Sequence, residues 1–210
     1  MKRAGIIIIL LMLFVVLGFG EDSLYSAKEA YQKGKISTAY LQIKKAVDSG
    51  DDRLDTYLYA GIIYSDYGKT EEAIEVLFLG LQKYPKNEKL LTIAGRNYLR
   101  LEKYIEAYGI LKIALSTGNK DSRVREYIAD ACVGMGNFDD AIFYYNKAIS
   151  LNPNDSWVYI KLGSIQKRLG KTDEAKESFT TALEKAQEQN IKLLYQLAEH
   201  ELSFFINKDK

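Results

Sequence analysis

The sequence has few of the residues that form disulfides, break helices or bind metals. Its 210 residues include one cysteine, two prolines, one histidine and one tryptophan. A single cysteine excludes a disulfide within the chain, so the stability of the fold must come from packing. A hydrophobic content of 47% and an aromatic content of 12% are sufficient for a substantial apolar core.

Neither sign of charge dominates the sequence. The chain has 29 Lys and Arg residues and 28 Asp and Glu residues. Loss of Lys2 and Arg3 with an N-terminal segment would leave 27 basic residues, from 29 minus 2, and a net charge of −1. Binding of nucleic acid requires a clustered basic face, which this balance does not provide, so we expect no nucleic-acid partner.

Small residues recur along the chain at an interval of 34 residues. One position of the repeat is alanine in every block: Ala39, Ala73, Ala107, Ala141 and Ala175. Two further positions carry only alanine or glycine, as expected where neighbouring helices approach closely. We therefore take 21–189 as a repeat domain, with the register dividing it into five blocks: 20–53, 54–87, 88–121, 122–155 and 156–189.

A second column predicts a sharp turn near the middle of each block. Its residues are Gly34, Gly68, Glu102, Gly136 and Gly170. Glycine suits such a turn because it adopts positive φ without a steric penalty. Both prolines lie at one common position near the end of a block, where proline stops a helix. The pattern predicts two antiparallel helices of about 13 residues in each block.

Polar residues at fixed positions predict where these helices start. Asn87, Asp121 and Asp155 each end a block, at the expected N-cap of the next helix. Thr70 and Thr172 open second helices and are expected to cap them with their hydroxyl groups. Acidic residues follow both threonines, as favoured by the positive end of the helix dipole.

The block resembles the tetratricopeptide repeat, a 34-residue helix–turn–helix unit. The resemblance rests on positions such as Tyr57, Gly61, Tyr64, Ala73 and Pro85 in the second block. It implies an all-α fold, a right-handed α-solenoid of helix–turn–helix repeats, which we expect a C-terminal capping helix to close. It also implies a non-enzymatic scaffold or adaptor for protein–protein interactions, whose ligand is set by surface residues.

The first 20 residues form a segment of another kind. Lys2 and Arg3 precede an uncharged apolar run over 6–17, and Gly18 and Gly20 follow it. This arrangement is typical of a secretory signal with a cut after Gly20. An uncleaved membrane anchor is the alternative, although about 20 apolar residues cross a bilayer more comfortably. We expect an exported protein, periplasmic or anchored to the cytoplasmic membrane and facing outward.

Residues 190–210 are predicted to form a capping helix and a tail. A stack of repeats exposes the apolar flank of its last member unless another element covers it. Apolar residues recur at helical spacing in this segment: Ile191, Leu194, Leu197, Ala198, Leu202 and Phe205. The adjacent apolar run 204–206 leaves a second hypothesis open, in which this end seats a partner or a second copy.

No group of residues suggests catalysis, a metal or a cofactor. His200 is the only histidine and lies between two glutamates, as is typical of a solvated face. Cys132 lies where a repeat places a core residue, and a buried cysteine behaves as a small hydrophobe. A nucleophile with its base, or a cluster of metal ligands, is missing from the sequence. We expect neither enzymatic activity nor a cofactor.

The resemblance places certain first-helix positions on the inner, concave face of the repeats, where family members bind segments of partner proteins. Position 6 of the block is mostly aromatic or apolar here, and nearby positions add charge. The predicted partner-binding residues are Tyr25, Tyr59, Ile62, Ile93, Arg96, Tyr127, Trp157 and Lys161. The predicted function is an interaction scaffold outside the cytoplasm, for instance in envelope assembly. The alternative is a membrane-anchored structural subunit that assembles through its C-terminal helix.

Overall fold

The computed structural model describes residues 23–206, and every regular element in that range is a helix. The predicted all-α fold class is confirmed. The signal or anchor predicted over 1–20 and the last four residues of the tail lie outside the described residues. Within 23–206, no helix is both long enough and apolar enough to cross a membrane. The chain divides into two compact units, residues 1–103 and 104–210, which are described separately below.

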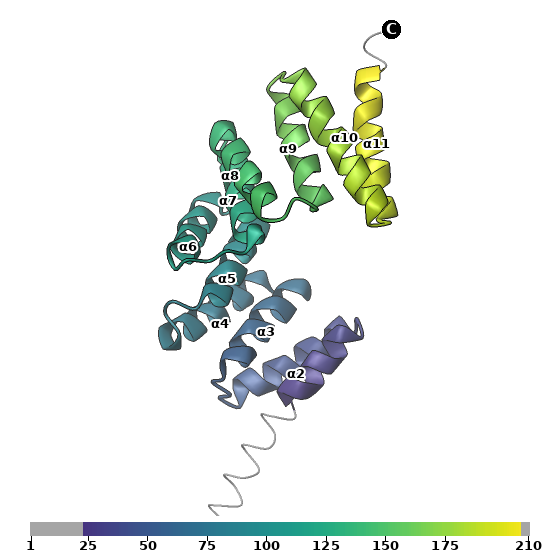
Figure 1. Cartoon of the computed structure of the whole chain (residues 1–210). Coiled ribbons are helices and arrows are strands. Elements are labelled where there is room, and N and C mark those ends of the chain that lie inside the picture. Colours follow the sequence, from purple (N-terminus) through teal and green to yellow (C-terminus); the bar gives the residue numbers. More distant parts are fainter. Residues whose placement is uncertain (1–22, 207–210) are drawn as a thin grey trace, which may run out of the picture. The chain divides into compact units, whose positions relative to one another are not determined.

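Unit 1 is a stack of helices joined by short turns (Figure 1). A helix over 23–32 is followed by four others: α2 (Ile36–Asp48), α3 (Leu54–Asp66), α4 (Thr70–Lys83) and α5 (Glu88–Arg100). Each helix from α2 onward packs on the next, and α3 also packs on α5. Alanines of the repeat pattern, such as Ala39 and Ala73, are fully buried between these helices.

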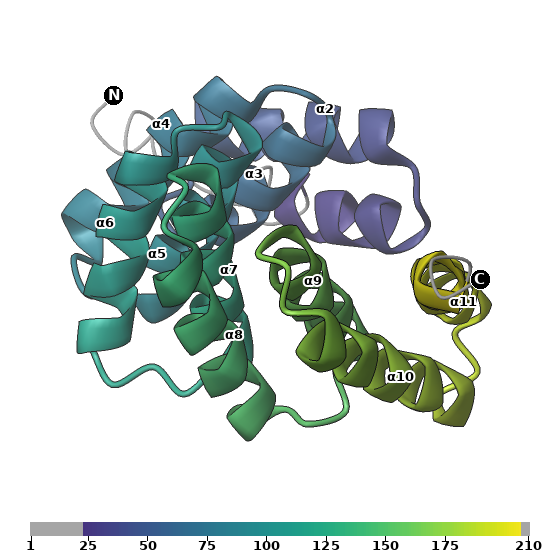
Figure 2. The same cartoon turned by 90° about the horizontal axis from the view of Figure 1, so that it is seen from above.

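Unit 2 continues the same pattern and ends in an additional helix (Figures 1 and 2). Its helices are α6 (Tyr104–Ser116), α7 (Ser122–Gly134), α8 (Phe138–Leu151), α9 (Ser156–Arg168), α10 (Thr172–Glu188) and α11 (Lys192–Ile206). Each helix packs on its neighbour in the chain, and α11 packs on both α10 and α9. The division between the units falls inside the third block, after its first helix.

Glycines in the small-residue columns allow the two helices of a block to approach closely. A Cβ atom built on Gly61 would lie 2.5 Å from Cδ2 of Leu77, and one built on Gly163 would lie 2.9 Å from Cε1 of Phe179. Both distances are too short for carbon atoms in contact. The missing side chain therefore provides the space in which Leu77 and Phe179 become fully buried.

Asn87, Asp121 and Asp155 are confirmed as N-caps, whereas the predicted capping by the hydroxyl groups of Thr70 and Thr172 is wrong. The side chains of Asn87 and Asp121 accept hydrogen bonds from backbone N–H groups of Leu90 and Arg123. Asp155 makes no such bond. Thr70 and Thr172 are the first helical residues rather than N-caps. The cap positions before them are lysines, so the tight turn, rather than a capping hydroxyl, starts these helices.

The apolar face of α11 covers the last repeat. Ala198 and Phe205 are buried in one cluster with Ile160 and Phe179, and the Phe179 and Phe205 rings lie 6.3 Å apart between centroids. Phe204, in contrast to the buried Phe205, is 48% exposed. The ammonium group of Lys167 lies 3.8 Å from the centroid of the Phe204 ring.

Glu102 occupies a turn position at which four sister blocks have glycine, and its φ is +57°. A non-glycine residue in this region carries strain of order 1–3 kcal/mol, whereas glycine costs only about 0.5–1 kcal/mol of extra chain entropy. We predict that Glu102→Gly stabilises the fold by about 0.5–1 kcal/mol, measured by urea denaturation.

The matched control is Gly68→Ala at the equivalent turn, where φ is +92° and a Cβ would touch nothing. This change should destabilise the protein by about 1 kcal/mol or more, through backbone strain alone. A loss of stability in Glu102→Gly would contradict the assignment of strain to Glu102.

Candidate functional site

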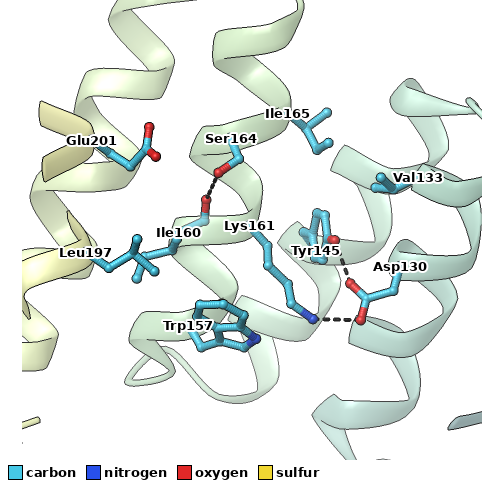
Figure 3. A pocket seen from close by; sticks show the side chains of 10 residues that line it. All are labelled: Asp130, Val133, Tyr145, Trp157, Ile160, Lys161, Ser164, Ile165, Leu197 and Glu201. Carbon is cyan, nitrogen blue, oxygen red and sulfur yellow. Dashed lines mark hydrogen bonds and ion pairs between the residues drawn. The ribbon is translucent and has the colours of Figure 1, made fainter. Parts of the chain in front are cut away.

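A pocket of about 370 Å³ opens in unit 2 between α7, α8, α9 and α11 (Figure 3). Half of the residues that line it are apolar: Val133, Trp157, Ile160, Ile165 and Leu197. Polar residues from α7, α8, α9 and α11 complete its walls. A mostly apolar concave site with a few placed polar groups is the general form of a ligand-binding site.

Helix α9 contributes half of the lining because of its residue spacing. The lining residues of α9 follow each other at intervals of three, one, three and one residues, so they share one face of the helix. They are Trp157, Ile160, Lys161, Ser164 and Ile165. Residues of its other face are almost fully buried: Val158 and Leu162. One side of α9 therefore holds the stack together and the other faces the pocket.

Lys161 is the centre of a polar network on the α7 side of the pocket. Its Nζ donates to Oδ2 of Asp130 at 2.6 Å and to Oε1 of Glu126 at 2.8 Å. The hydroxyl group of Tyr145 donates to Oδ1 of Asp130 at 2.7 Å. Figure 3 shows both contacts of Asp130, together with Trp157 beside Lys161. The Lys161 ammonium group lies 5.7 Å from the centroid of the Trp157 ring.

Burial and the neighbouring charges together shift the pKa values of this network. It raises the pKa of Glu126, with help from the nearby negative charges of Asp130 and Asp155, although Lys161 acts in the opposite direction. Burial also disfavours the charged form of Lys161, but Asp130 and Glu126 outweigh it and raise the pKa of the ammonium group. The pKa of Tyr145 is raised by burial and by Asp130, so Tyr145 remains a hydrogen-bond donor at neutral pH.

A second ion pair lies on the α11 side. Lys167 Nζ contacts Oε2 of Glu201 at 2.9 Å, and Glu201 lines the pocket with Leu197. The two pocket walls thus each carry a carboxylate paired with a lysine from α9. The cap is therefore part of the site as well as a cover for the last repeat.

Two of the predicted partner-binding residues, Trp157 and Lys161, line this pocket together. Tyr127 is half-buried on α7 and does not line it. Tyr145 and Glu201 also line the pocket, but neither was among the residues predicted from the sequence. Tyr145 occupies an aromatic position of the second helix that the repeat pattern assigns to packing, and Glu201 belongs to the cap. Tyr145 is buried, and only the hydrogen bond from its hydroxyl group to Asp130 distinguishes it from a purely structural residue.

The other predicted residues lie in unit 1 and line no described pocket. Tyr25 is 70% exposed. The ammonium group of Lys28 lies 4.7 Å from the ring centroid of Tyr59. Ile62 and Ile93 are half-buried. Arg96 has buried Nε and Nη2 atoms without a hydrogen-bond partner among the described residues.

A tyrosine, an aspartate and an arginine form a polar cluster in unit 1. The hydroxyl group of Tyr31 donates a hydrogen bond to Oδ2 of Asp66 at 2.6 Å, and Nη1 of Arg100 donates one to Oδ1 of the same carboxylate at 2.6 Å. Burial opposes ionisation of Asp66, but these two hydrogen bonds outweigh it and lower its pKa. Burial and Asp66 together raise the pKa of Tyr31 to about 12.

Cys132 and His200 have the surroundings expected from the sequence. Cys132 is fully buried in unit 2, and His200 is exposed on α11. Burial, with a smaller effect from Asp140, raises the pKa of the Cys132 thiol to about 11. Among residues 23–206, no three or more His, Cys, Asp or Glu side chains form a group that could hold a metal ion.

We predict that native Cys132 resists alkylation. At neutral pH, a rise in thiol pKa from 9 to about 11 reduces the thiolate fraction about 100-fold, and burial slows access further. Iodoacetamide labelling followed by mass spectrometry should be at least about 100-fold slower in the native protein than in urea. Equal rates would show that Cys132 is accessible and reactive.

Sequence comparison identifies tetratricopeptide repeats in unit 2. Two sequence models described as tetratricopeptide repeat match residues 126–155 and 144–177. Among curated proteins, the anaphase-promoting complex subunit 3 of Schizosaccharomyces pombe is 25% identical over 158 residues, which are 75% of this chain and 23% of that protein. The human Superkiller complex protein 3 is 29% identical over 94 residues, which are 45% of this chain and 6% of that protein.

Solved structures of MamA have a similar fold. One superposes with a TM-score of 0.68 at 25% identity, covering 78% of this chain and 96% of the MamA chain. Another, MamA from residue 41 to its end from Desulfovibrio magneticus RS-1, has a TM-score of 0.72 at 19% identity, covering 81% and 97%. Residues 126–177 therefore form tetratricopeptide repeats, and the fold of the chain is that of a scaffold for protein–protein interactions. The chain spans about a quarter or less of the length of the curated relatives described above.

Proposed function

We propose that this protein is a non-enzymatic adaptor that acts outside the cytoplasm and binds a segment of a partner protein in the pocket of unit 2. The observation that carries the proposal is the indole of Trp157, which is 41% exposed at a concave site walled by Ile160 and Leu197. Exposure of such a group costs free energy unless a ligand covers it. Buried tryptophans are among the side chains that contribute most to binding at interfaces.

The relatives support a role inside a larger assembly. Two of them are named as components of complexes, the anaphase-promoting complex and the Superkiller complex. Membership of those two complexes is a property of the relatives. For this chain we propose only the more general role of holding other proteins together by binding short segments of them.

The pocket is tested by photocrosslinking in cells. The photoreactive residue p-benzoylphenylalanine replaces Trp157 in one variant and Phe143 in a matched control, because Phe143 is a similarly exposed aromatic residue on α8 outside the pocket. We expect one defined crosslinked protein from position 157 that is absent from position 143. With that protein purified, Trp157→Ala should weaken binding about 30-fold, equivalent to about 2 kcal/mol, and Phe143→Ala should have little effect. Equal effects of the two alanine variants would exclude the pocket.

The proposal of export rests on the charge and apolar pattern of residues 1–20. Fusion of residues 1–30 to alkaline phosphatase, which is active only after export, tests it directly. Intact-mass analysis of the native protein should show a loss of about 2 kDa if a signal peptidase cuts after Gly20. An inactive fusion would contradict export. An active fusion with full intact mass would favour the anchored alternative, in which an uncleaved segment 6–17 holds a structural subunit.

The anchored alternative also assigns assembly to the C-terminal helix. The exposed ring of Phe204 is the observation that favours it. Sedimentation of the protein with and without Phe204→Ser tests this role. A dimer that dissociates in the variant would support it, and a monomer in both would exclude it.

A further inference from the structure

We infer that the pocket of unit 2 selects partner segments in which a large apolar residue is accompanied by an arginine or a lysine. The inference rests on the proposed function, because it names the chemistry of the segment that the same pocket would bind. It depends on three features of the described residues: the charge around the pocket, the state of its lysines and the shape of its apolar walls.

The charge around the pocket is negative. Four carboxylates lie in or next to it: those of Glu126, Asp130, Asp155 and Glu201. Among the residues that the structure describes, two ammonium groups contact members of this set, those of Lys161 and Lys167. The excess of two negative charges favours a cationic ligand, and the low dielectric of a partly buried site strengthens the attraction.

Both lysines already have carboxylate partners. Lys161 contacts Asp130 at 2.6 Å and Glu126 at 2.8 Å, and Lys167 contacts Glu201 at 2.9 Å. An acidic residue of a partner could bind either lysine only by displacing one of these carboxylates. A basic residue meets no such obstacle, because a carboxylate offers about four acceptor sites and can bind a second donor.

The apolar walls fit the rest of such a segment. A cavity of about 370 Å³ is at the small end of the range for ligand sites, so it accommodates one or two side chains rather than a whole helix. Ile160, Ile165 and Leu197 provide an apolar surface for a leucine-sized anchor. The exposed face of the Trp157 ring can pack against the stem of an arginine or attract its guanidinium group.

Trp157 provides the readout for a direct test, since it is the only tryptophan of the chain and lines the pocket. The probes are pools of ten-residue peptides without tryptophan or tyrosine, randomised except at two positions one helical turn apart. Four pools carry Leu and Arg, Leu and Gln, Leu and Glu, or Ser and Arg at these positions. Each pool is titrated into the full-length protein while Trp157 fluorescence is recorded.

We expect the Leu and Arg pool to bind at least about tenfold more tightly than the Leu and Glu pool at low salt, with the Leu and Gln pool between them. Added salt should reduce this preference because it screens partly exposed charges. The Ser and Arg pool should bind more weakly than the Leu and Arg pool, since it lacks the apolar anchor.

A double variant removes the excess charge without changing the shape of the site. Asp155→Asn keeps an equally good N-cap residue and removes no side-chain cap hydrogen bond. Glu201→Gln keeps an oxygen that can accept from Lys167. In the double variant, the preference for arginine over glutamate should fall to within about threefold. The control, Glu177→Gln with Glu184→Gln, makes the same charge change at exposed positions of α10 outside the pocket and should retain the preference.

The outcomes separate the inference from the proposed function. Equal or tighter binding of the Leu and Glu pool, or equal binding of the Ser and Arg pool, would overturn the inferred specificity while the pocket remained a binding site. A preference for arginine that survives in the double variant would also overturn it, because the excess negative charge removed with Asp155 and Glu201 would not be its source. If no pool changed the fluorescence of Trp157, both the specificity and the pocket assignment would be wrong.

Discussion

Replacement of Phe179 by alanine should lower the free energy of unfolding by about 3–5 kcal/mol, the range measured for loss of a buried phenylalanine. Phe179 is fully buried. Its ring fills the space left by Gly163 on α9 and lies 6.3 Å from the ring of Phe205 on α11. The side chain therefore joins three helices, and its removal leaves a cavity that none of them can fill without moving.

The position of Phe179 near the end of the stack increases the effect on the cap. Repeats contact only their neighbours, so α11 depends on α10 and α9 for its burial. We expect hydrogen exchange of α11 amides to accelerate in Phe179→Ala more than exchange in unit 1. Urea denaturation followed by circular dichroism measures the overall loss. The control Phe143→Ala removes a ring that is 53% exposed and should cost less than about 1 kcal/mol. Similar losses in the two variants would contradict the central role of Phe179.

Replacement of Lys161 by methionine should also destabilise the protein by about 3–5 kcal/mol, the cost of removing one partner from a buried ion pair. The Lys161 side chain is only 19% exposed, and that of Glu126 only 9%. Methionine preserves most of the length of the side chain, so packing is nearly retained. The loss would come from two carboxylates, those of Glu126 and Asp130, left close together without a counter-charge.

The pH dependence identifies this cause. Burial already raises the pKa of Glu126 above 4.5, and loss of Lys161 removes the main opposing charge. A carboxylate whose pKa is higher in the folded than in the unfolded protein destabilises the fold as pH rises from the unfolded toward the folded value. The difference in unfolding free energy between wild type and Lys161→Met should therefore be larger at pH 8 than at pH 5.

Two controls complete this test. Lys161→Arg retains the positive charge and should recover part of the stability. Lys147→Met makes the same chemical change at an exposed position of α8 and should cost less than about 0.5 kcal/mol. A deficit of Lys161→Met that is the same at both pH values would show that lost packing, rather than unpaired charge, is responsible.

The regular elements could be predicted because their causes are local. The 34-residue period, the alanine column and the turn column predicted the helices and their connections, including a turn at Glu102, where φ is positive despite the missing glycine. Capping was harder to predict, since Asp155 and Asp121 occupy the same block position but only Asp121 makes the cap hydrogen bond. The division of the chain after Lys103 has no counterpart in the repeat pattern, which continues through it unchanged.

The candidate site could be predicted only in part. Trp157 and Lys161 depart from what repeat packing requires, and both line the pocket. Tyr145 occupies a position that the repeat uses for packing, and Glu201 is one of several charged residues on the cap helix. Their residue types alone therefore did not indicate that they line a site. Residues predicted in unit 1, such as Tyr25 and Arg96, satisfied the same sequence criterion without lining a described pocket. Their assignment to partner binding remains a prediction.

The sequence by itself determined that this chain forms repeated pairs of helices with small residues at their contacts, because periodic side chains and turn conformations act over a few neighbouring residues. The tertiary structure alone decided which polar groups meet. It brings Lys161 of α9 to Glu126 and Asp130 of α7, 31 to 35 residues away, and places Glu201 of the cap across the same pocket. Such contacts depend on desolvation and on the angle between packed helices, which the repeat period does not encode.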